Sequence, residues 1–229
     1  MKGLAVSLSE PDMQNNFKIL MNHIEMMFDT RSEGLLKMYS DMETQVIMAP
    51  ASSREHYHNA FPGGYLDHIL RVLEFSFKVF ETWKACGIEL DFTPEELAFV
   101  AIHHDLGKIG LPIENGDRYI WCQSDWHRKN QGKIYEPNPN IPFMHVQDMS
   151  LFLLQKYNIP MTFNETLGIK LHDGLYEEAN DSYYLARSLD SELRTYLPMV
   201  VHQADLLASR FEKDRWLKAS GKTPKPYKG

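Results

Sequence analysis

The sequence predicts an all-α fold, and three observations lead to this prediction. Apolar residues recur at helical spacing along most of the chain. Two capping boxes, Thr93 with Glu96 and Thr162 with Glu165, mark the starts of helices. No segment shows the sustained alternation of a strand. With 229 residues, of which 43% are hydrophobic, the chain is long enough to form a large domain with its own core.

The first part of the chain is expected to be helical over residues 11–48 and to pack on the core, with Gly34 as a weak point. Prolines and a glycine pair predict a loop over residues 49–64. The next helix should cover residues 65–86, and its two apolar sides indicate a central position in the fold. His68 lies at the head of one of these apolar stripes.

Thr93 is expected to cap a helix that runs to about Leu106, where Gly107 can end it. His104 lies on the apolar face of this helix, so its side chain should project inward near the helix end. Residues 107–144 are expected to form a long irregular loop, and a loop of this length inside a domain is typical of a functional lid.

Four further helices are expected, over residues 146–157, 163–172, 183–195 and 198–219. The predicted organisation is an N-terminal helical segment over 1–48, a main domain over 49–219 and a basic, frayed tail over 220–229. No apolar run approaches the roughly 18 residues of a membrane helix, and the N-terminal apolar stretch is too short for a signal peptide. We therefore expect a cytoplasmic protein.

Net charge and cysteine content narrow the classes of function. The formal charge of −7 argues against a protein dedicated to binding long nucleic acid, because such binding rests on clustered Lys and Arg. The two cysteines, Cys86 and Cys122, are too few for a four-thiolate zinc site, and they do not form a Cys-x-x-Cys pair. They are expected to be reduced thiols.

The segment IHHDLGK at residues 102–108 carries the clearest chemical signal. His104 and Asp105 offer an imidazole and a carboxylate, which suit divalent ions such as Mn, Fe, Zn, Co, Ni or Mg. Helix neighbours point about 100° apart, so both side chains reach one ion only near a helix end. Taken alone, the dipeptide is explained better by a surface His–Asp pair.

Other residues make a metal centre the stronger interpretation. His68 and Asp205 lie on otherwise apolar helix faces, where an unpaired charge is costly. A satisfied core histidine and a paired carboxylate remain open as alternatives for these two. His145 precedes a predicted helix and His172 ends one, and with Asp105 as a bridge they could hold a second ion. Two ions about 3.5–4 Å apart bind a phosphoryl group and activate a bridging hydroxide.

In this order, the elements resemble the HD-domain superfamily of metal-dependent phosphohydrolases. The segment APASSREHYHNAFPGGYLDH at 49–68 is similar to the entry segment of HD domains in YhaM-type 3′–5′ exoribonucleases and related relaxases. The sequences HHDLGK, LHDG at 171–174 and VVHQAD at 200–205 are similar too, so the resemblance covers about 49–211. The chain lacks two features of relatives: a strand-rich oligonucleotide-binding barrel before the HD domain, and the GYP element of cyclic-dinucleotide enzymes.

The resemblance implies roles for individual residues. The metal ligands that it implies are His68, His104, Asp105 and Asp205, with His145 and His172 as the extra ligands of a two-ion site. Asp105 would orient or bridge the nucleophile, and Lys108 would face the substrate phosphate as a second catalytic residue. Arg54 and His58, in the entry loop, would also contact substrate.

The implied function is hydrolysis of a phosphoester of a nucleotide or a related small phosphorylated substrate by a metal-activated hydroxide, with two divalent ions (Mn, Fe, Ni, Co, Zn or Mg) as the expected cofactors. Two alternatives stay open: a 3′–5′ exonuclease or phosphodiesterase acting on short oligonucleotides, and a non-catalytic module that senses nucleotides. A homo-oligomer is also left open, and no membrane partner is expected. Tyr119, Trp121 and Trp126 could stack on a base, although aromatic residues in a loop more often anchor it to the core.

Overall fold

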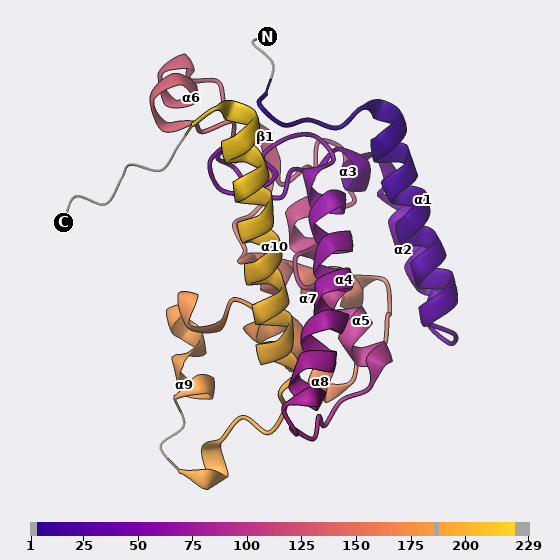
Figure 1. Cartoon of the computed structure of the whole chain (residues 1–229). Helices are drawn as coiled ribbons and strands as arrows, with labels where there is room; N and C mark the ends of the chain where they lie inside the picture. Colours follow the sequence, from indigo (N-terminus) through magenta and orange to yellow (C-terminus); the bar gives the residue numbers. More distant parts are fainter. Residues whose placement is uncertain (1–3, 186–187, 223–229) are drawn as a thin grey trace, which may run out of the picture.

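The computed structural model describes residues 4–185 and 188–222 (Figure 1). It is 62% helix and 4% strand, so the all-α class is confirmed. No helix among the described residues is both long enough and apolar enough to cross a bilayer.

The N-terminal segment forms three helices, α1 (Glu10–Met27), α2 (Ser32–Asp41) and α3 (Glu43–Met48). The predicted helical content is correct, but the break comes at residues 28–31 and not at Gly34, which lies inside α2. Phe28 ends α1 with its ring fully buried edge-on against Phe99. Side chains of α1, α2 and α3 belong to the same hydrophobic core as those of the later helices.

The turn after α1 carries Arg31 into the interior. Its guanidinium lies 2.8 Å from Glu165 and 2.6 Å from Glu95, and it covers the ring of Phe99 at 4.2 Å from the centroid. Glu165 is fully buried, so its carboxylate depends on this cation for compensation. The ion pairs therefore attach the N-terminal segment to two helices of the main domain.

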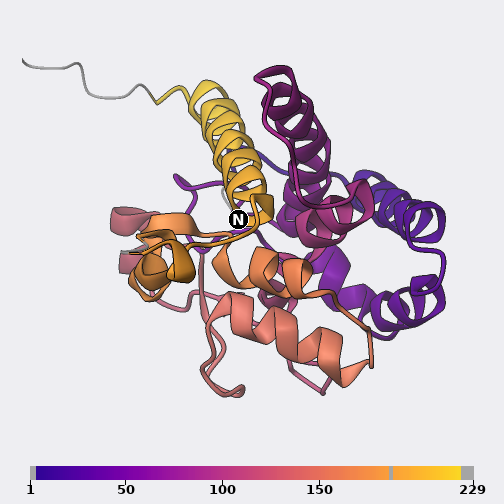
Figure 2. The same cartoon turned by 90° about the horizontal axis from the view of Figure 1, so that it is seen from below.

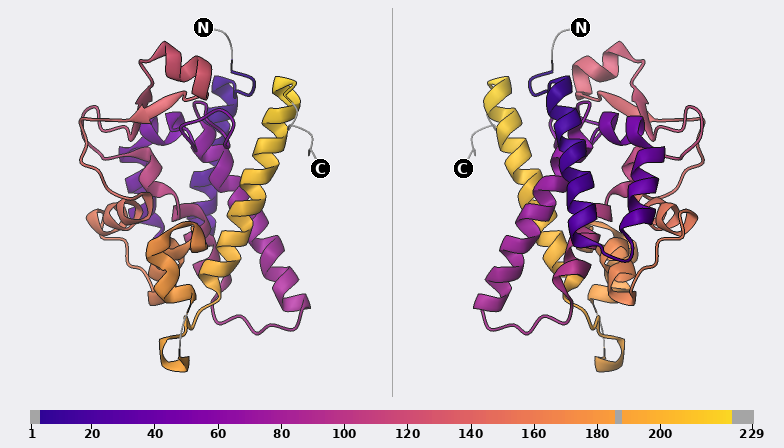
Figure 3. Two further views of the ribbon diagram at one scale, coloured as in Figure 1. Left: turned by 90° about the vertical axis from the view of Figure 1, so that its left-hand side faces the viewer. Right: turned by 90° about the vertical axis from the view of Figure 1, so that its right-hand side faces the viewer.

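The centre of the molecule is the pair α4 (Gly64–Ala85) and α10 (Leu197–Ser220), which are neighbours in Figure 1 and cross each other in the views of Figure 3. Helix α5 (Pro94–His103) packs on α4, and α8 (Phe163–Leu171) packs on both α5 and α10. Helix α7 (Val146–Lys156) covers the outer side of α8, as Figure 2 shows. The central position predicted for the helix at 65–86 is thus observed.

Helix α5 ends earlier than predicted. It stops at His103, and a separate 3-10 turn, η1 (Leu106–Ile109), follows. Gly107 lies within that turn and does not cap α5. A Cβ at Gly107 would come within 2.2 Å of the carbonyl oxygen of Val146, so this glycine permits close packing of η1 against α7.

The segment 107–144 is more ordered than an irregular loop. It contains strand β1 (Tyr119–Trp121), helix α6 (Asp125–Gln131) and strand β2 (Tyr135–Pro137), and the two strands pair antiparallel. The prediction of an irregular loop is therefore wrong for these residues. Three-residue strands are too short for an alternating pattern to show in the sequence.

The helix predicted over 183–195 is also wrong. Only α9 (Asp181–Tyr184) and the 3-10 turns η2 (Gly174–Tyr176), η3 (Glu178–Asn180) and η4 (Leu189–Ser191) form in this region of the described chain. The apolar residues there are largely exposed, including Leu185 and Leu189, so they provide no packed face to stabilise a helix. Beyond Lys222, the predicted basic tail lies outside the described residues.

The capping box at Thr93 gives a test of how α5 is held. The Thr93 hydroxyl accepts a hydrogen bond from the backbone N–H of Glu96, and the Glu96 carboxylate accepts one from the backbone N–H of Thr93. We expect Thr93→Ala to lower the free energy of unfolding by about 1 kcal/mol in urea titrations. Thr82→Ala, an exposed position near the end of α4, should change it by less than about 0.5 kcal/mol. Equal effects of the two substitutions would contradict a capping role.

Candidate metal centre

His68, His104 and Asp205 meet although they come from three different helices. His68 lies in the first turns of α4, His104 at the C-terminal end of α5 and Asp205 in the first half of α10. Each offers one ligand atom, and these atoms lie within 4.8 Å of one another. The Nε2 atom of His68 is 3.1 Å from Oδ1 of Asp205. Both histidines are fully buried.

A second group adjoins the first. Its members are His104, Asp105 and His172, whose ligand atoms also lie within 4.8 Å of one another. Oδ2 of Asp105 is 3.5 Å from Nε2 of His104 and 3.6 Å from Nε2 of His68, whereas Oδ1 is 3.8 Å from Nε2 of His172. The two oxygens of Asp105 therefore face the two different groups, and His104 belongs to both.

The hydrogen bonds of the three imidazoles leave the Nε2 atoms free for a metal ion. Nδ1 of His104 donates to the carbonyl of Ala101 at 2.9 Å, and Nδ1 of His172 donates to that of Ile169 at 2.8 Å. Because a carbonyl only accepts, these contacts place the proton on Nδ1. The Nε2 atoms of His68 and His104 are buried and have no hydrogen-bond partner of good geometry. Such unpartnered nitrogens beside two carboxylates fit a transition-metal ion.

The electrostatic field inside the cluster favours a cation. Burial alone would lower the pKa of His68, but the carboxylates of Glu212 and Asp205 outweigh burial and raise that pKa to about 10. Burial would raise the pKa of Asp105, yet Lys108 and His104 hold it well below the usual range. The same negative field that retains a proton on His68 attracts a divalent ion, which would displace that proton.

Lys108 and His58 also face the cluster. Nζ of Lys108 lies 2.5 Å from Oδ2 of Asp105. The His58 ring is 4.9 Å from that of His68, and burial, Lys108 and His68 lower the pKa of His58 to about 3, so the ring is neutral. Arg54 is half-buried in the entry loop, where its backbone bridges to Lys133 and its guanidinium lies over Tyr57.

The structure places His145 differently from the other predicted ligands. It is the N-cap residue of α7, its side chain is 54% exposed, and its nearest charged partner is Glu177 at 3.7 Å. Neither ligand group found among the described residues contains it. Five of the six predicted ligands thus come together, and metal binding by His145 stays a prediction.

The sequence interpretation missed Glu212, which supports His68 from behind. The fully buried Glu212 carboxylate lies 3.1 Å from Nδ1 of His68 and 2.5 Å from Nη1 of Arg71. Asp67 completes the network, because it pairs with Arg71 at 3.0 Å and with Arg215 at 2.7 Å. A carboxylate on the second imidazole nitrogen orients a metal-binding histidine and increases its basicity. Glu212 could have been recognised from the sequence, because it follows Asp205 by two helical turns and lies on the same helix face as Ala208.

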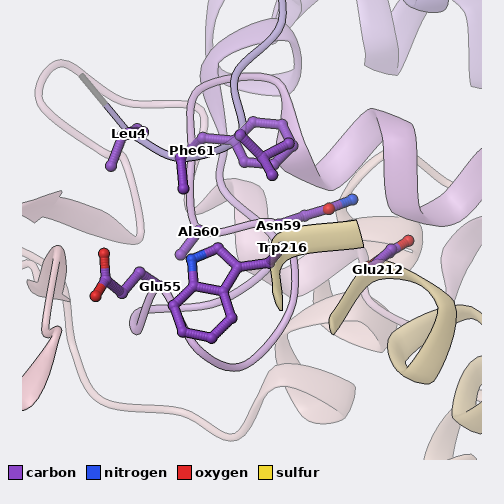
Figure 4. Close-up of a pocket in the computed structure, with 9 residues that line it drawn as sticks. Leu4, Glu55, Asn59, Ala60, Phe61, Glu212 and Trp216 are labelled. Atoms are coloured by element: carbon purple, nitrogen blue, oxygen red, sulfur yellow. The ribbon is translucent and has the colours of Figure 1, made fainter. Parts of the chain in front are cut away.

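Glu212 also borders a small cavity, which Figure 4 shows between Leu4, the loop at 55–61 and Trp216. Its volume of about 10 Å³ gives room for about one water molecule and no more. This cavity is therefore too small to hold a substrate.

Comparison of the chain with protein-family models, with curated proteins and with solved structures finds no match. The function is therefore inferred from the residues and the geometry of the site.

The support by Glu212 can be tested directly. We expect Glu212→Gln to weaken divalent-ion binding by about 10- to 100-fold, because the amide keeps the size of the side chain but removes the charge that acts on His68. The measurement is a competition titration with a metal-sensitive dye. Glu74→Gln, on the exposed part of α4, is the matched control and should leave the affinity unchanged. An unaltered affinity in a folded Glu212→Gln variant would rule out the supporting role.

Proposed function

We propose that the chain is a metal-dependent phosphohydrolase of the HD type, acting on a phosphoester of a nucleotide or a related small phosphorylated substrate. The observation that carries the proposal is the pair of adjoining ligand groups that share His104, with the two oxygens of Asp105 facing one group each. His68, His104 and Asp205 would hold one divalent ion and His172 would help to hold a second, with a carboxylate oxygen of Asp105 available to each. The mixed imidazole and carboxylate donors suit Mn, Fe, Co, Ni or Zn better than Mg or Ca.

A bound pair of ions would supply Lewis acidity and a water molecule of lowered pKa, which is the chemistry that phosphoester hydrolysis requires. The residues of this chain contribute the remaining functions. Lys108 carries a positive charge beside Asp105, where it can offset charge on the phosphate oxygens. Burial of Lys108 would lower its pKa, but Asp105 and Tyr119 raise it, so the ammonium group stays charged at neutral pH.

The proposal assigns His58 to substrate binding as a neutral group. Its Nε2 atom is buried and has no hydrogen-bond partner. Since the ring stays neutral, it can donate one hydrogen bond to a phosphate oxygen without adding charge to the cluster. Substrate binding by Arg54 also remains part of the proposal; in the structure its guanidinium lies over the ring of Tyr57.

The central test combines metal analysis with a hydrolysis screen. The protein as purified should contain one or two transition-metal ions per chain. It should release inorganic phosphate or a nucleotide product from a panel of nucleoside mono- and triphosphates, cyclic nucleotides and short oligonucleotides supplied with Mn, Co, Ni or Mg. Preference for oligonucleotides would identify the exonuclease alternative. Tight nucleotide binding without turnover would identify a sensing module.

Substitutions on α10 and after α5 connect the activity to the cluster. We expect Asp105→Asn and Asp205→Asn each to lower both metal content and turnover. The loss should exceed the effect of about 10- to 100-fold that is typical of a residue that only supports a ligand. Asp214→Asn, an exposed position on α10 paired with Lys218, is the matched control and should retain both. Normal turnover in a folded Asp105→Asn protein would show that the chemistry lies elsewhere.

A further inference from the structure

A groove beside the candidate metal centre is lined in part by Lys108. It has a volume of about 370 Å³, within the range of about 300–1,000 Å³ that small-molecule sites occupy. Met48 and Pro50 form part of one wall, and residues of the β1–β2 hairpin form part of another. Lys108 lines the groove and its ammonium group contacts Asp105, so the groove and the candidate metal centre adjoin at this lysine.

The hairpin gives the groove an aromatic wall made of Tyr119, Trp121 and Tyr135. Trp121 stands opposite Tyr135 in the strand register, and their rings meet edge-to-face at 5.8 Å. Tyr135 is buried, whereas Trp121 keeps 39% of its surface exposed. Met48, on the other wall, keeps 46% exposed. Tyr135 therefore anchors Trp121, and apolar surface remains open inside the groove.

The two tryptophans of this region differ in position. Trp121 lines the groove, whereas Trp126 lies on α6, is 60% exposed, contacts His127 and does not line the groove. The contact of the Arg128 guanidinium with the Trp121 ring, at 5.8 Å, further restricts the indole. Only one of the two tryptophans is therefore held where a ligand bound at Lys108 could reach it.

We propose that this groove binds the heterocyclic base of a nucleotide whose phosphate lies at Lys108 and the metal centre, with Trp121 as the specificity-determining contact. The inference rests on the proposed function and narrows its substrate class to nucleoside phosphates. An aromatic side chain stacks on any base, because every base presents a π-face. The volume of the groove, about 370 Å³, lies in the range of sites that bind one small molecule.

Binding gives a first test that needs no turnover. Nucleoside 5′-monophosphates and ribose 5-phosphate are titrated calorimetrically into the protein as purified. We expect the nucleotides to bind at least about 10-fold more tightly than the sugar phosphate, and Trp121→Ala to remove this difference. Trp121→Phe should restore most of it, and Trp126→Ala, the matched control, should retain it. Equal binding of nucleotide and sugar phosphate by the unmodified protein, or by both alanine variants alike, would overturn the proposal.

Kinetic measurements distinguish base binding in the groove from the phosphohydrolase activity itself. Hydrolysis is measured for each nucleotide beside its base-free counterpart, with ribose 5-phosphate matching the monophosphates and inorganic tripolyphosphate matching the triphosphates. Trp121→Ala should raise KM for the nucleotide about 10-fold and leave the base-free reaction unchanged. Hydrolysis with no preference for a base would overturn the groove assignment and leave the phosphohydrolase intact. Absence of any hydrolysis would reject the phosphohydrolase, and the binding experiment would then decide the groove assignment alone.

Discussion

The concentration of carboxylates in the interior is the constraint on which the rest of this structure depends. Asp105, Asp205 and Glu212 surround the imidazole of His68 within 3.6 Å of its ring nitrogens. Removing such groups from water is costly unless a cation or several hydrogen bonds compensate them. Lys108 and Arg71 provide part of the compensation from opposite sides. Proton uptake by His68 supplies more, and a divalent ion would supply the same compensation more completely.

The position at which α5 ends determines which side chains reach the cluster. Because α5 stops at His103, His104 and Asp105 lie at a helix end and project to the same cluster. The 3-10 turn that follows is held against α7, where the backbone N–H of Gly107 donates to the Ser150 hydroxyl and that hydroxyl donates to the carbonyl of His104. The hydroxyl of Ser150 and the lack of a side chain at Gly107 thus fix the backbone beside His104 and Asp105.

Much of this arrangement could be predicted from the sequence, because burial and helix periodicity mark it locally. The capping boxes placed α5 and α8 correctly. Apolar helix faces indicated His68, His104 and Asp205, whereas Asp105 was indicated by its place beside His104 and His172 by its place at a helix end, and these five residues come together. The failures have equally local causes. His145 shares a helix-end position with His172, but nothing in the sequence reveals that the chain before α7 leaves it half exposed. The strands β1 and β2 pair with each other although helix α6 lies between them in the sequence. A pattern read over a few consecutive residues cannot reveal such a pairing.

The support of His68 has a consequence for how the chain reaches its native state. His68 and Glu212 are 144 positions apart in the sequence, yet they make a direct buried hydrogen bond. Contacts of such long range form slowly, since the entropy of closing the intervening chain is lost before the contact contributes. The cluster is therefore among the last features expected to assemble during folding. An ion that binds only the assembled cluster would close a loop of most of the chain, as a cross-link does, and would slow the opening of α10 from α4.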